Sequence, residues 1–326
     1  MNRLQFVRRM FMLAVAACMP LKAALAAEYP VKTVRVVVPF GAGGLSDIIT
    51  RQLAVGLGEK LGQPVIVENK PGAGHIVSLQ TVANAPADGY TLLLGSNTGF
   101  TVSPHMYKKL NFDIAGFLPV AGVSLGPVAL VARPDFPASS LTEFAKLAKA
   151  KGASLNYGSY GVGSSAHIGM EMIKKDLGIE STHIPYKGDA GALQGLLGKE
   201  IDVAYVTLFS VQSRILSGEL KALGVMQADP IPRIPSIQTT KEAGWVNAEF
   251  PSWNALFAPA GTPPSIVKKV EDAVRAVVST PQFAEFLRGR GAEPWSASSE
   301  QLSQFVATQS HRIAPMVKAL DLQPGQ

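Results

Sequence analysis

Two glycine-rich turns hold the residues whose types and spacing could bind an anion. The first spans residues 40–47 (FGAGGLSD) and the second spans residues 158–165 (GSYGVGSS). Glycine has no Cβ, so the backbone of such a turn can come close to a ligand. A helix that starts at the turn adds free N–H groups and the positive end of its dipole. The sequence therefore predicts two anion-binding turns, although a purely structural strand–helix turn has the same pattern.

The same turns only partly match a dinucleotide-binding fingerprint. In the first turn, Ser46 stands where the third glycine is expected. The second turn fits the form G-x-G-x-x-A, but no acidic residue ends the next strand-like run at residues 183–186. A nucleotide-binding fold therefore stays a weak alternative, and we expect no cofactor.

Signals for hydrolytic or metal chemistry are poor. Residues 95–99 have Asn97 where a hydrolase elbow needs serine. The histidines lack the spacing of metal ligands, so we expect no metal site. They are His75, His105, His167, His183 and His311. An exported hydrolase of carboxylate esters or phosphates stays an alternative without a nucleophile–base pair to support it.

Charge is concentrated at the start of the chain. The 326 residues include 30 basic and 24 acidic ones, for a net charge of +6. Residues 1–26 hold four of the basic residues and no acidic one. Within them, Arg8-Arg9 precede an apolar run at residues 10–17, and the small-residue pattern Ala24-Leu25-Ala26 comes last. This order is typical of an export signal. Residues 27–326 then have a net charge of only +2, so we expect no nucleic-acid partner.

The route of export is less clearly marked. Arg8-Arg9 resembles a twin-arginine leader, but Val7 stands where Ser or Thr is usual, which favours the Sec route. Residues 15–18 end in Cys18 and resemble a lipobox, so a lipoprotein is a minority alternative. The sequence predicts a periplasmic protein that has lost residues 1–26.

Short β-rich runs alternate with helical patterns along the rest of the chain, which is typical of α/β layers. We expect residues 27–125 and 251–326 to form one domain, residues 126–250 a second domain, and the ligand cleft to lie between them. The runs that predict strands are residues 34–38, 65–67, 90–94, 128–132, 155–157, 183–186, 203–206, 221–225 and 255–259.

Residues 36–47 resemble the signature of the Bug family, the periplasmic solute-binding receptors of tripartite tricarboxylate transporters. The likeness covers residues 28–320 in order. It implies an α/β periplasmic-binding-protein clamshell (Venus flytrap, type II) with two domains, each a mixed, mostly parallel sheet flanked by helices. Further segments that match the family are residues 67–74, 87–93, 156–159, 164–167, 184–188 and 257–263.

The resemblance implies a binding protein rather than an enzyme. Such a monomer would capture a small mono-, di- or tricarboxylate by domain closure and deliver it to the membrane permease subunits of a tripartite tricarboxylate transporter. A sensor subunit that presents its ligand to a signalling partner would use the same cleft and is the alternative.

The resemblance also implies the ligand contacts. Thr207 stands where the family often has an acidic residue, which predicts carboxylate ligands without an amine. The contacts implied in the first domain are Phe40, Gly44, Asp47, Ser96 and Asn97. Those implied in the second domain are Ser159, Gly163, Ser164, Ser165, His167 and Thr207.

Overall fold

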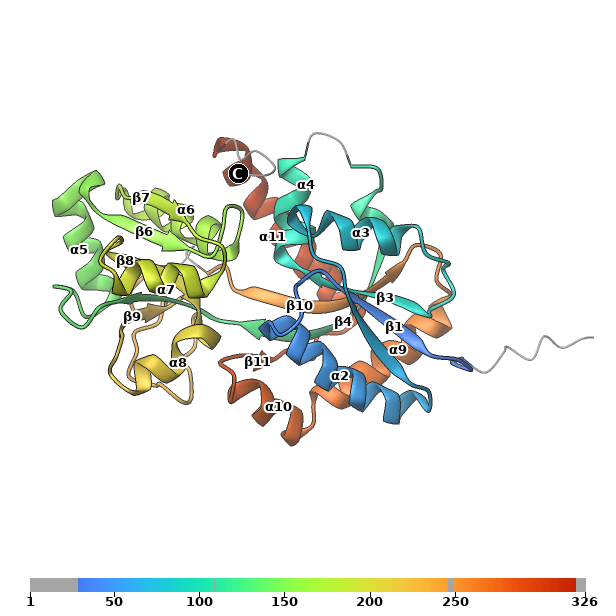
Figure 1. Ribbon diagram of the computed structural model, residues 1–326. Helices are drawn as coiled ribbons and strands as arrows, with labels where there is room; N and C mark the ends of the chain where they lie inside the picture. Colours follow the sequence, from blue (N-terminus) through green and yellow to red (C-terminus); the bar gives the residue numbers. More distant parts are fainter. Residues whose placement is uncertain (1–28, 108–109, 246–248, 321–326) are drawn as a thin grey trace, which may run out of the picture. The chain divides into compact units, whose positions relative to one another are not determined.

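The computed structural model describes residues 29–107, 110–245 and 249–320. The predicted export signal, residues 1–26 with Cys18, lies outside the described residues. Residues Lys32–Gln326 form one compact unit. Within that unit the strands form two separate sheets, each flanked by helices (Figure 1).

The first sheet is built around a parallel β–α–β–α–β arrangement. Strands β1 (Val34–Val38), β2 (Val65–Asn69) and β3 (Thr91–Ser96) alternate with helices α2 (Leu45–Leu61) and α3 (Ile76–Ala83). β1 pairs in parallel with both β2 and β3. The order of the whole sheet is β11-β4-β10-β3-β1-β2. Its other strands are β4 (Phe117–Gly126), β10 (Ser252–Pro259) and β11 (Glu293–Pro294).

The second sheet has the order β7-β6-β8-β5-β9. Here β6 pairs in parallel with β7 and β8, whereas β5 pairs antiparallel with β8 and β9. Its strands are β5 (Val128–Ala132), β6 (Asn156–Ser159), β7 (Thr182–Pro185), β8 (Val203–Thr207) and β9 (Lys221–Val225). Its helices are α5 (Leu141–Lys151), α6 (Ser165–Leu177), α7 (Asp189–Leu197) and α8 (Leu208–Leu216).

The chain passes between the sheets in two places. β4 ends at Gly126 and β5 of the second sheet begins at Val128; the chain returns to the first sheet as β10. Because one strand leaves the first sheet and the other re-enters it, β10 runs antiparallel to β4, and it is also antiparallel to β3. Both sheets are therefore mixed, with parallel pairing confined to the β–α–β parts rather than dominant as expected.

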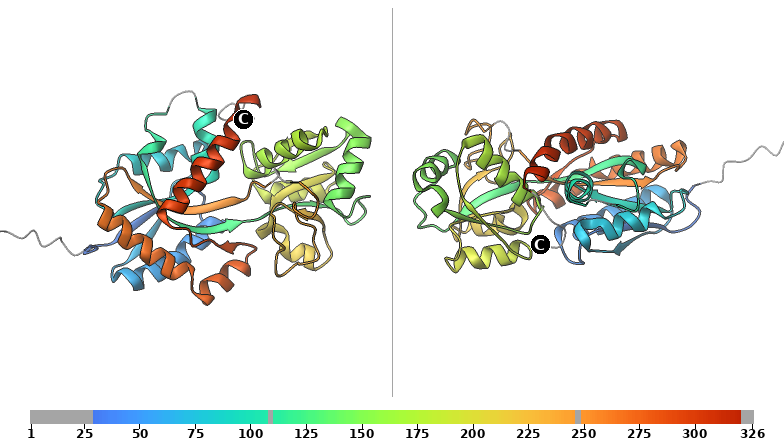
Figure 2. Two further views of the ribbon diagram at one scale, coloured as in Figure 1. Left: turned by 180° about the vertical axis from the view of Figure 1, so that it is seen from behind. Right: turned by 90° about the horizontal axis from the view of Figure 1, so that it is seen from above.

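Helices from the end of the chain cover the first sheet. α9 (Pro264–Val278) packs against α2 and β4, and α11 (Ser299–Ala319) packs against β4 on the opposite side, as the views in Figures 1 and 2 agree. α11 also contacts α6. The remaining elements are short: α4 (Ser103–Met106), α10 (Pro281–Arg288), and the turns η1 (Ala73–His75), η2 (Thr98–Val102), η3 (Ile114–Gly116) and η4 (Gly152–Ser154).

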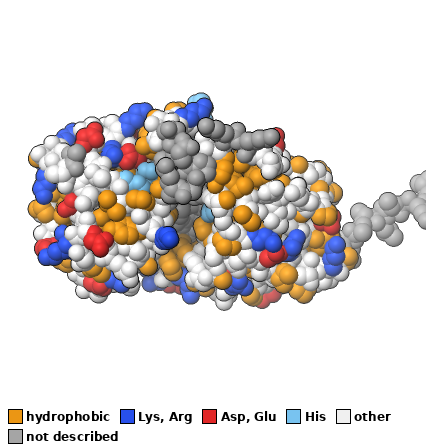
Figure 3. Space-filling view, turned by 45° about the horizontal axis from the view of Figure 1, so that its top comes forward, with side chains coloured by type: hydrophobic (Ala, Val, Ile, Leu, Met, Phe, Trp, Pro, Cys, Tyr) orange, Lys and Arg blue, Asp and Glu red, His pale blue; other side chains and the backbone are white. Residues whose placement is uncertain are grey.

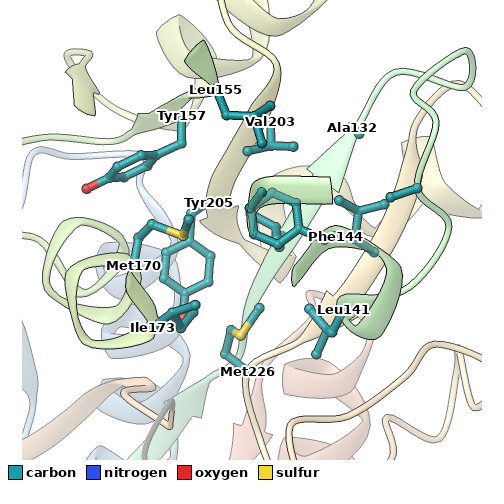
Figure 4. Packing of buried hydrophobic residues seen from close by; sticks show 14 of the residues in the cluster. Ala132, Leu141, Phe144, Leu155, Tyr157, Met170, Ile173, Val203, Tyr205 and Met226 are labelled. Carbon is teal, nitrogen blue, oxygen red and sulfur yellow. The ribbon is translucent and has the colours of Figure 1, made fainter. Parts of the chain in front are cut away.

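The core of the second sheet explains its continuous apolar strands. Successive side chains of a strand point to opposite faces. Tyr205 packs with Phe144 on one face (Figure 4), in the same cluster as Leu130. Ala129 and Val131 pack into a second cluster on the other face. A strand with helices on both faces has hydrophobic residues at every position. Residues 128–132 show this pattern, and all five are buried.

In the part of the chain that the structure describes, neither the charge on one face of the molecule nor the helices point to a strongly charged patch or a membrane-spanning segment. On the face shown in Figure 3, Lys and Arg side chains are mixed with Asp, Glu and uncharged residues and do not gather into one patch. No helix in the described residues has the length and apolar character needed to cross a bilayer.

Candidate functional site

A cavity of about 340 Å³ lies where the carboxyl ends of strands from both sheets meet the starts of the following helices. Ligands of open α/β sheets bind at such edges, and this volume is within the usual range for small-molecule sites. Helices α2, α6, α7 and α8 all begin at its wall. The lining residues are Phe40, Gly44, Leu45, Ser46, Ile49, Asn97, Thr98, Ser124, Gly126, Tyr160, Ser165, Gly188, Asp189, Thr207, Phe209, Ser210, Ser252, Trp253, Asn254 and Ala292.

The first glycine-rich turn presents the start of α2 to this cavity. Gly44 is the N-cap of α2 and has no side chain to bond the N–H groups of the first turn. Those groups are free to bind an acceptor from outside the helix. Phe40 lines the same wall, and its ring makes an edge contact with His75 at a centroid distance of 4.6 Å.

Asp47 of the same turn does not line the cavity. Its carboxylate accepts hydrogen bonds from the backbone N–H of Gly43 (2.8 Å), from Arg51 (3.0 Å) and from Asn69 (2.8 Å). Burial alone would raise the pKa of Asp47, but these donors outweigh it and lower the pKa. Asp47 is thus an ionised group that holds the glycine-rich turn in place.

In the second glycine-rich turn, some residues hold the turn and the helix start in place, and others line the cavity. Ser164 is the N-cap of α6: its hydroxyl accepts from the N–H of His167 (3.2 Å) and donates to the carbonyl of Gly161 (2.6 Å). The N–H of Gly163 donates to Nδ1 of His167 (3.1 Å). Ser165 is the first residue of α6 and lines the cavity, whereas Gly163, Ser164 and His167 do not.

Ser96 and Ser159 lie behind the cavity, each in contact with a histidine. The Ser96 hydroxyl is 2.8 Å from Nδ1 of His75, and the Ser159 hydroxyl is 2.7 Å from Nε2 of His183. Neither serine lines the cavity. Burial lowers the pKa of His75 to about 4, so this histidine is neutral at pH 7.

Asn97 and Ser165 connect the two sheets at the cavity. The side-chain amide of Asn97, at the end of β3, donates a hydrogen bond to the hydroxyl of Ser165. Tyr160 lies beside them, with its phenol oxygen facing the Ser165 hydroxyl and the N–H groups of Ser165 and Ala166. Burial and the neighbouring Asp189 raise the pKa of Tyr160, so this residue is a neutral phenol.

Thr207, a predicted contact residue, lines the cavity. The carboxylate of Asp189 lies beside it and accepts a hydrogen bond from its hydroxyl. The side chains of Thr207 and Ser210 both donate to Asp189, and the N–H of Thr207 donates to the same carboxylate (3.3 Å). The lack of an acidic residue after strand β8 predicted ligands without an amine. Asp189 supplies a carboxylate at that place from α7, which removes the reason for this expectation.

A model of the tripartite tricarboxylate transporter family receptor matches residues 49–322. The chain belongs to this family. It is 53% identical over 310 residues to a UPF0065 protein of Bordetella pertussis, covering 95% of this chain and 96% of that one.

Solved structures of similar proteins agree with the assignment. The periplasmic binding protein BugD is 34% identical, with a TM-score of 0.76 over 90% of this chain and 99% of its own. R. palustris Rpa4515 with adipate is 30% identical, with a TM-score of 0.79 over 89% and 97%. MatC from Rhodopseudomonas palustris with bound malate is 31% identical, with a TM-score of 0.75 over 89% and 100%. The fold is therefore that of a periplasmic binding protein.

Several cavity residues of this tripartite tricarboxylate transporter receptor were not predicted from its sequence. Tyr160 is within a turn that was singled out, and Asp189 follows Gly188 at a helix start, so the strand–glycine–helix pattern could have found it. Ser124 and Asn254 lie on β4 and β10, where the Asn254 amide donates to the Ser124 hydroxyl (3.2 Å). Their proximity depends on strand pairing that no local pattern reveals.

Proposed function

We propose that this chain captures a small carboxylate in the cavity and delivers it to the membrane subunits of a tripartite tricarboxylate transporter. Membership of the receptor family supports the transport role. Relatives with adipate and malate bound support a carboxylate as the ligand.

The observation that carries the proposal is the convergence of helix starts on one cavity. α2 begins at Gly44 with no side-chain cap, and α6 begins with Ser165 in the cavity wall. Helix N-termini offer N–H donors and positive dipole ends to an anion. No Lys, Arg or His is among the described residues that line the cavity. A ligand carboxylate would therefore be bound by backbone N–H groups and by the side chains of Asn97 and Ser165.

Binding would be coupled to movement of the two sheets relative to each other. The cavity wall contains residues attached to both sheets, as well as Ser124 and Asn254 on the strands that lead between them. A ligand that contacts both sides favours the arrangement in which both contacts are made. The membrane subunits would recognise that ligand-bound arrangement.

We propose that the protein acts in the periplasm after cleavage behind Ala26. The basic, apolar and small-residue order of residues 1–26 supports export. The Sec route is favoured over the twin-arginine route because Val7 precedes the arginine pair.

We also propose that the protein is not an enzyme. The serine–histidine pair of Ser310 with His105 (3.0 Å) does not line the cavity. Two more pairs, Ser96 with His75 and Ser159 with His183, also resemble a nucleophile with its base. Both serines are buried, at 2% and 0% exposure, and neither lines the cavity. A substrate in the cavity would therefore not reach either hydroxyl.

A thermal-shift screen of the purified protein with mono-, di- and tricarboxylates tests the proposal, followed by calorimetry of the compounds that raise Tm. At about 100 times Kd, a ligand that binds only the folded state adds about 2.7 kcal/mol of stability. The corresponding amides, which lack the negative charge, are the control. The proposal fails if no carboxylate raises Tm, or if the amides do so equally well.

A further inference from the structure

Asp189 is the one acidic or basic side chain among the described residues that line the cavity. It is the first residue of α7, and Gly188 before it is the N-cap. α7 lies against β8 (Figure 1). Asp189 and Thr207, at the end of β8, both line the cavity. The charge of this wall therefore depends on one residue.

Three donors fix the orientation of the Asp189 carboxylate. Oδ1 accepts from the N–H of Thr207 (3.3 Å), and Oδ2 accepts from the hydroxyls of Thr207 and Ser210. A carboxylate has about four acceptor positions on its two oxygens. Three are used by the protein, which leaves one, and Asp189 is partly exposed at the cavity wall. A group in the cavity can thus meet a carboxylate that is already oriented.

The protein supplies no cation to balance this group within the cavity. The lining residues of the described chain are uncharged apart from Asp189, which in turn raises the pKa of the neighbouring Tyr160 phenol. Burial raises the pKa of Asp189, although the donors on Ser210 and Thr207 act in the opposite direction. The Asp189 carboxylate is hydrogen-bonded but has no cation beside it among the lining residues, so a cationic ligand group would be stabilised there.

We propose that Asp189 makes the site selective for amino-carboxylates, small molecules with a carboxylate and an ammonium group. This inference rests on the proposed function, because it assigns the carboxylate of the ligand to the helix starts at Gly44 and Ser165. The ammonium group would then occupy the end of the cavity at Asp189, Thr207 and Ser210. A second carboxylate at that end would instead place two negative charges side by side.

Matched probe pairs measured by calorimetry at pH 7 test the selectivity. We would compare aspartate with succinate and γ-aminobutyrate with butyrate, after a thermal-shift screen of further amino-carboxylates and their amine-free analogues. We expect the best amino-carboxylate to bind at least about tenfold more tightly than its amine-free analogue, because hydrogen bonds between charged groups are the strong ones.

The substitution Asp189→Asn keeps the shape of the side chain and removes its charge. We expect the preference to fall to less than about threefold in this variant. Asp272→Asn is the control: it makes the same change at an exposed carboxylate of α9 that does not line the cavity, and the preference should remain. Melting curves of both variants would show that they are folded.

The outcomes separate this inference from the proposed function. If amine-free carboxylates bind best, or if Asp189→Asn keeps the preference for amines, the role of Asp189 is wrong while carboxylate binding stands. We expect Asp189→Asn to bind dicarboxylates such as succinate more tightly, because the substitution removes the negative charge beside their second carboxylate; unchanged or weaker binding of dicarboxylates would contradict the inference. If no compound of either class binds, the proposed function itself fails.

Discussion

Asn97 donates a hydrogen bond to Ser165, and this contact joins the end of β3 in the first sheet to the start of α6 beside the second sheet. Both residues line the cavity and both are nearly buried, at 3% and 2% exposure. The same two polar groups are therefore available either to each other or to a molecule held between them. A ligand bound at this point, as proposed, would replace or extend an existing contact.

Ser165→Ala should weaken ligand binding without unfolding the protein. The variant loses one hydroxyl in the cavity wall, and a single hydrogen bond contributes about 0.5–1.5 kcal/mol. We expect an increase in Kd of about three- to tenfold. Because the hydroxyl also accepts from the buried amide of Asn97, the Tm of the ligand-free protein should fall by about 2–4 °C. Calorimetry and thermal melting measure the two effects.

The neighbouring substitution Ser164→Ala is the matched control. Ser164 caps α6 and does not line the cavity. Losing an N-cap costs about 1 kcal/mol, which should lower Tm by about 2–4 °C with a smaller change in Kd. Identical effects of the two substitutions would contradict the division of roles between these adjacent serines.

Asp47→Ala should destabilise the protein, because Asp47 is 2% exposed and joins Gly43, Arg51 and Asn69. Hydrogen bonds to a charged group contribute about 1.5–3 kcal/mol, so we expect a loss of about 2–3 kcal/mol in denaturant unfolding. The folded-state pKa of Asp47 is below its ordinary value of 3.8. The stabilisation is therefore complete above that value and is lost as the pH falls through the lowered pKa.

Asp272→Ala provides the comparison for Asp47. Asp272 forms an ion pair with Lys268 on the surface of α9, where its side chain is 59% exposed. Exposed ion pairs contribute little, so this variant should stay within about 0.5 kcal/mol of the original. An equal loss of stability in both variants would mean that the bonds of Asp47 do not hold the turn.

His167 and His183 should make the protein less stable in mild acid. Their rings stack at a centroid distance of 3.9 Å. Burial lowers the pKa of His167 to about 4; burial and the neighbouring His167 lower that of His183 to about 3. The unfolded chain takes up protons near the ordinary value of 6.5, so stability is complete above that pH and decreases as the pH falls toward about 4.

Urea unfolding at pH 7 and at about pH 5 measures this loss, which we expect to be on the order of 2 kcal/mol for each histidine. His167→Asn keeps a polar side chain but does not titrate, so its pH dependence should be smaller. His311 is exposed on α11, and His311→Asn should leave the pH dependence unchanged. A pH profile that is the same in all three proteins would rule out the stacked pair as its cause.

Local patterns were enough to predict the parts of the fold that depend on neighbouring residues. The alternation of apolar strands, glycine turns and amphipathic helices predicted β1, α2, β6 and α6, because each of these begins or ends at a signal in its own sequence. β4 was missed, since Pro119, Gly122 and Gly126 interrupt its strand pattern. It is stabilised by pairing with β10, which lies far away in the sequence.

The cavity was predictable to the extent that it follows from helix starts. Phe40, Gly44 and Ser165 line it because they lie where a strand turns into a helix. Which serine of the turn lines the cavity depends on which one caps α6, and for that reason the sequence could not separate Ser165 from Ser164. Asp189 lies beside Thr207 because α7 packs against β8. No pattern within either segment predicts that packing.

Gly44→Ser should stabilise the empty protein and weaken its binding of carboxylates. Gly44 has an extended backbone at φ −75° and ψ 165°, and a Cβ there would meet only the carbonyl of Gly41, at 3.6 Å. A serine can therefore fit as the N-cap of α2 and accept a hydrogen bond from its first turn, adding a few tenths of a kcal/mol. Its hydroxyl would occupy the N–H groups that the proposed ligand needs. We expect a small rise in Tm and an increase in Kd of about tenfold; a rise in Tm with unchanged Kd would show that the carboxylate does not bind at the start of α2.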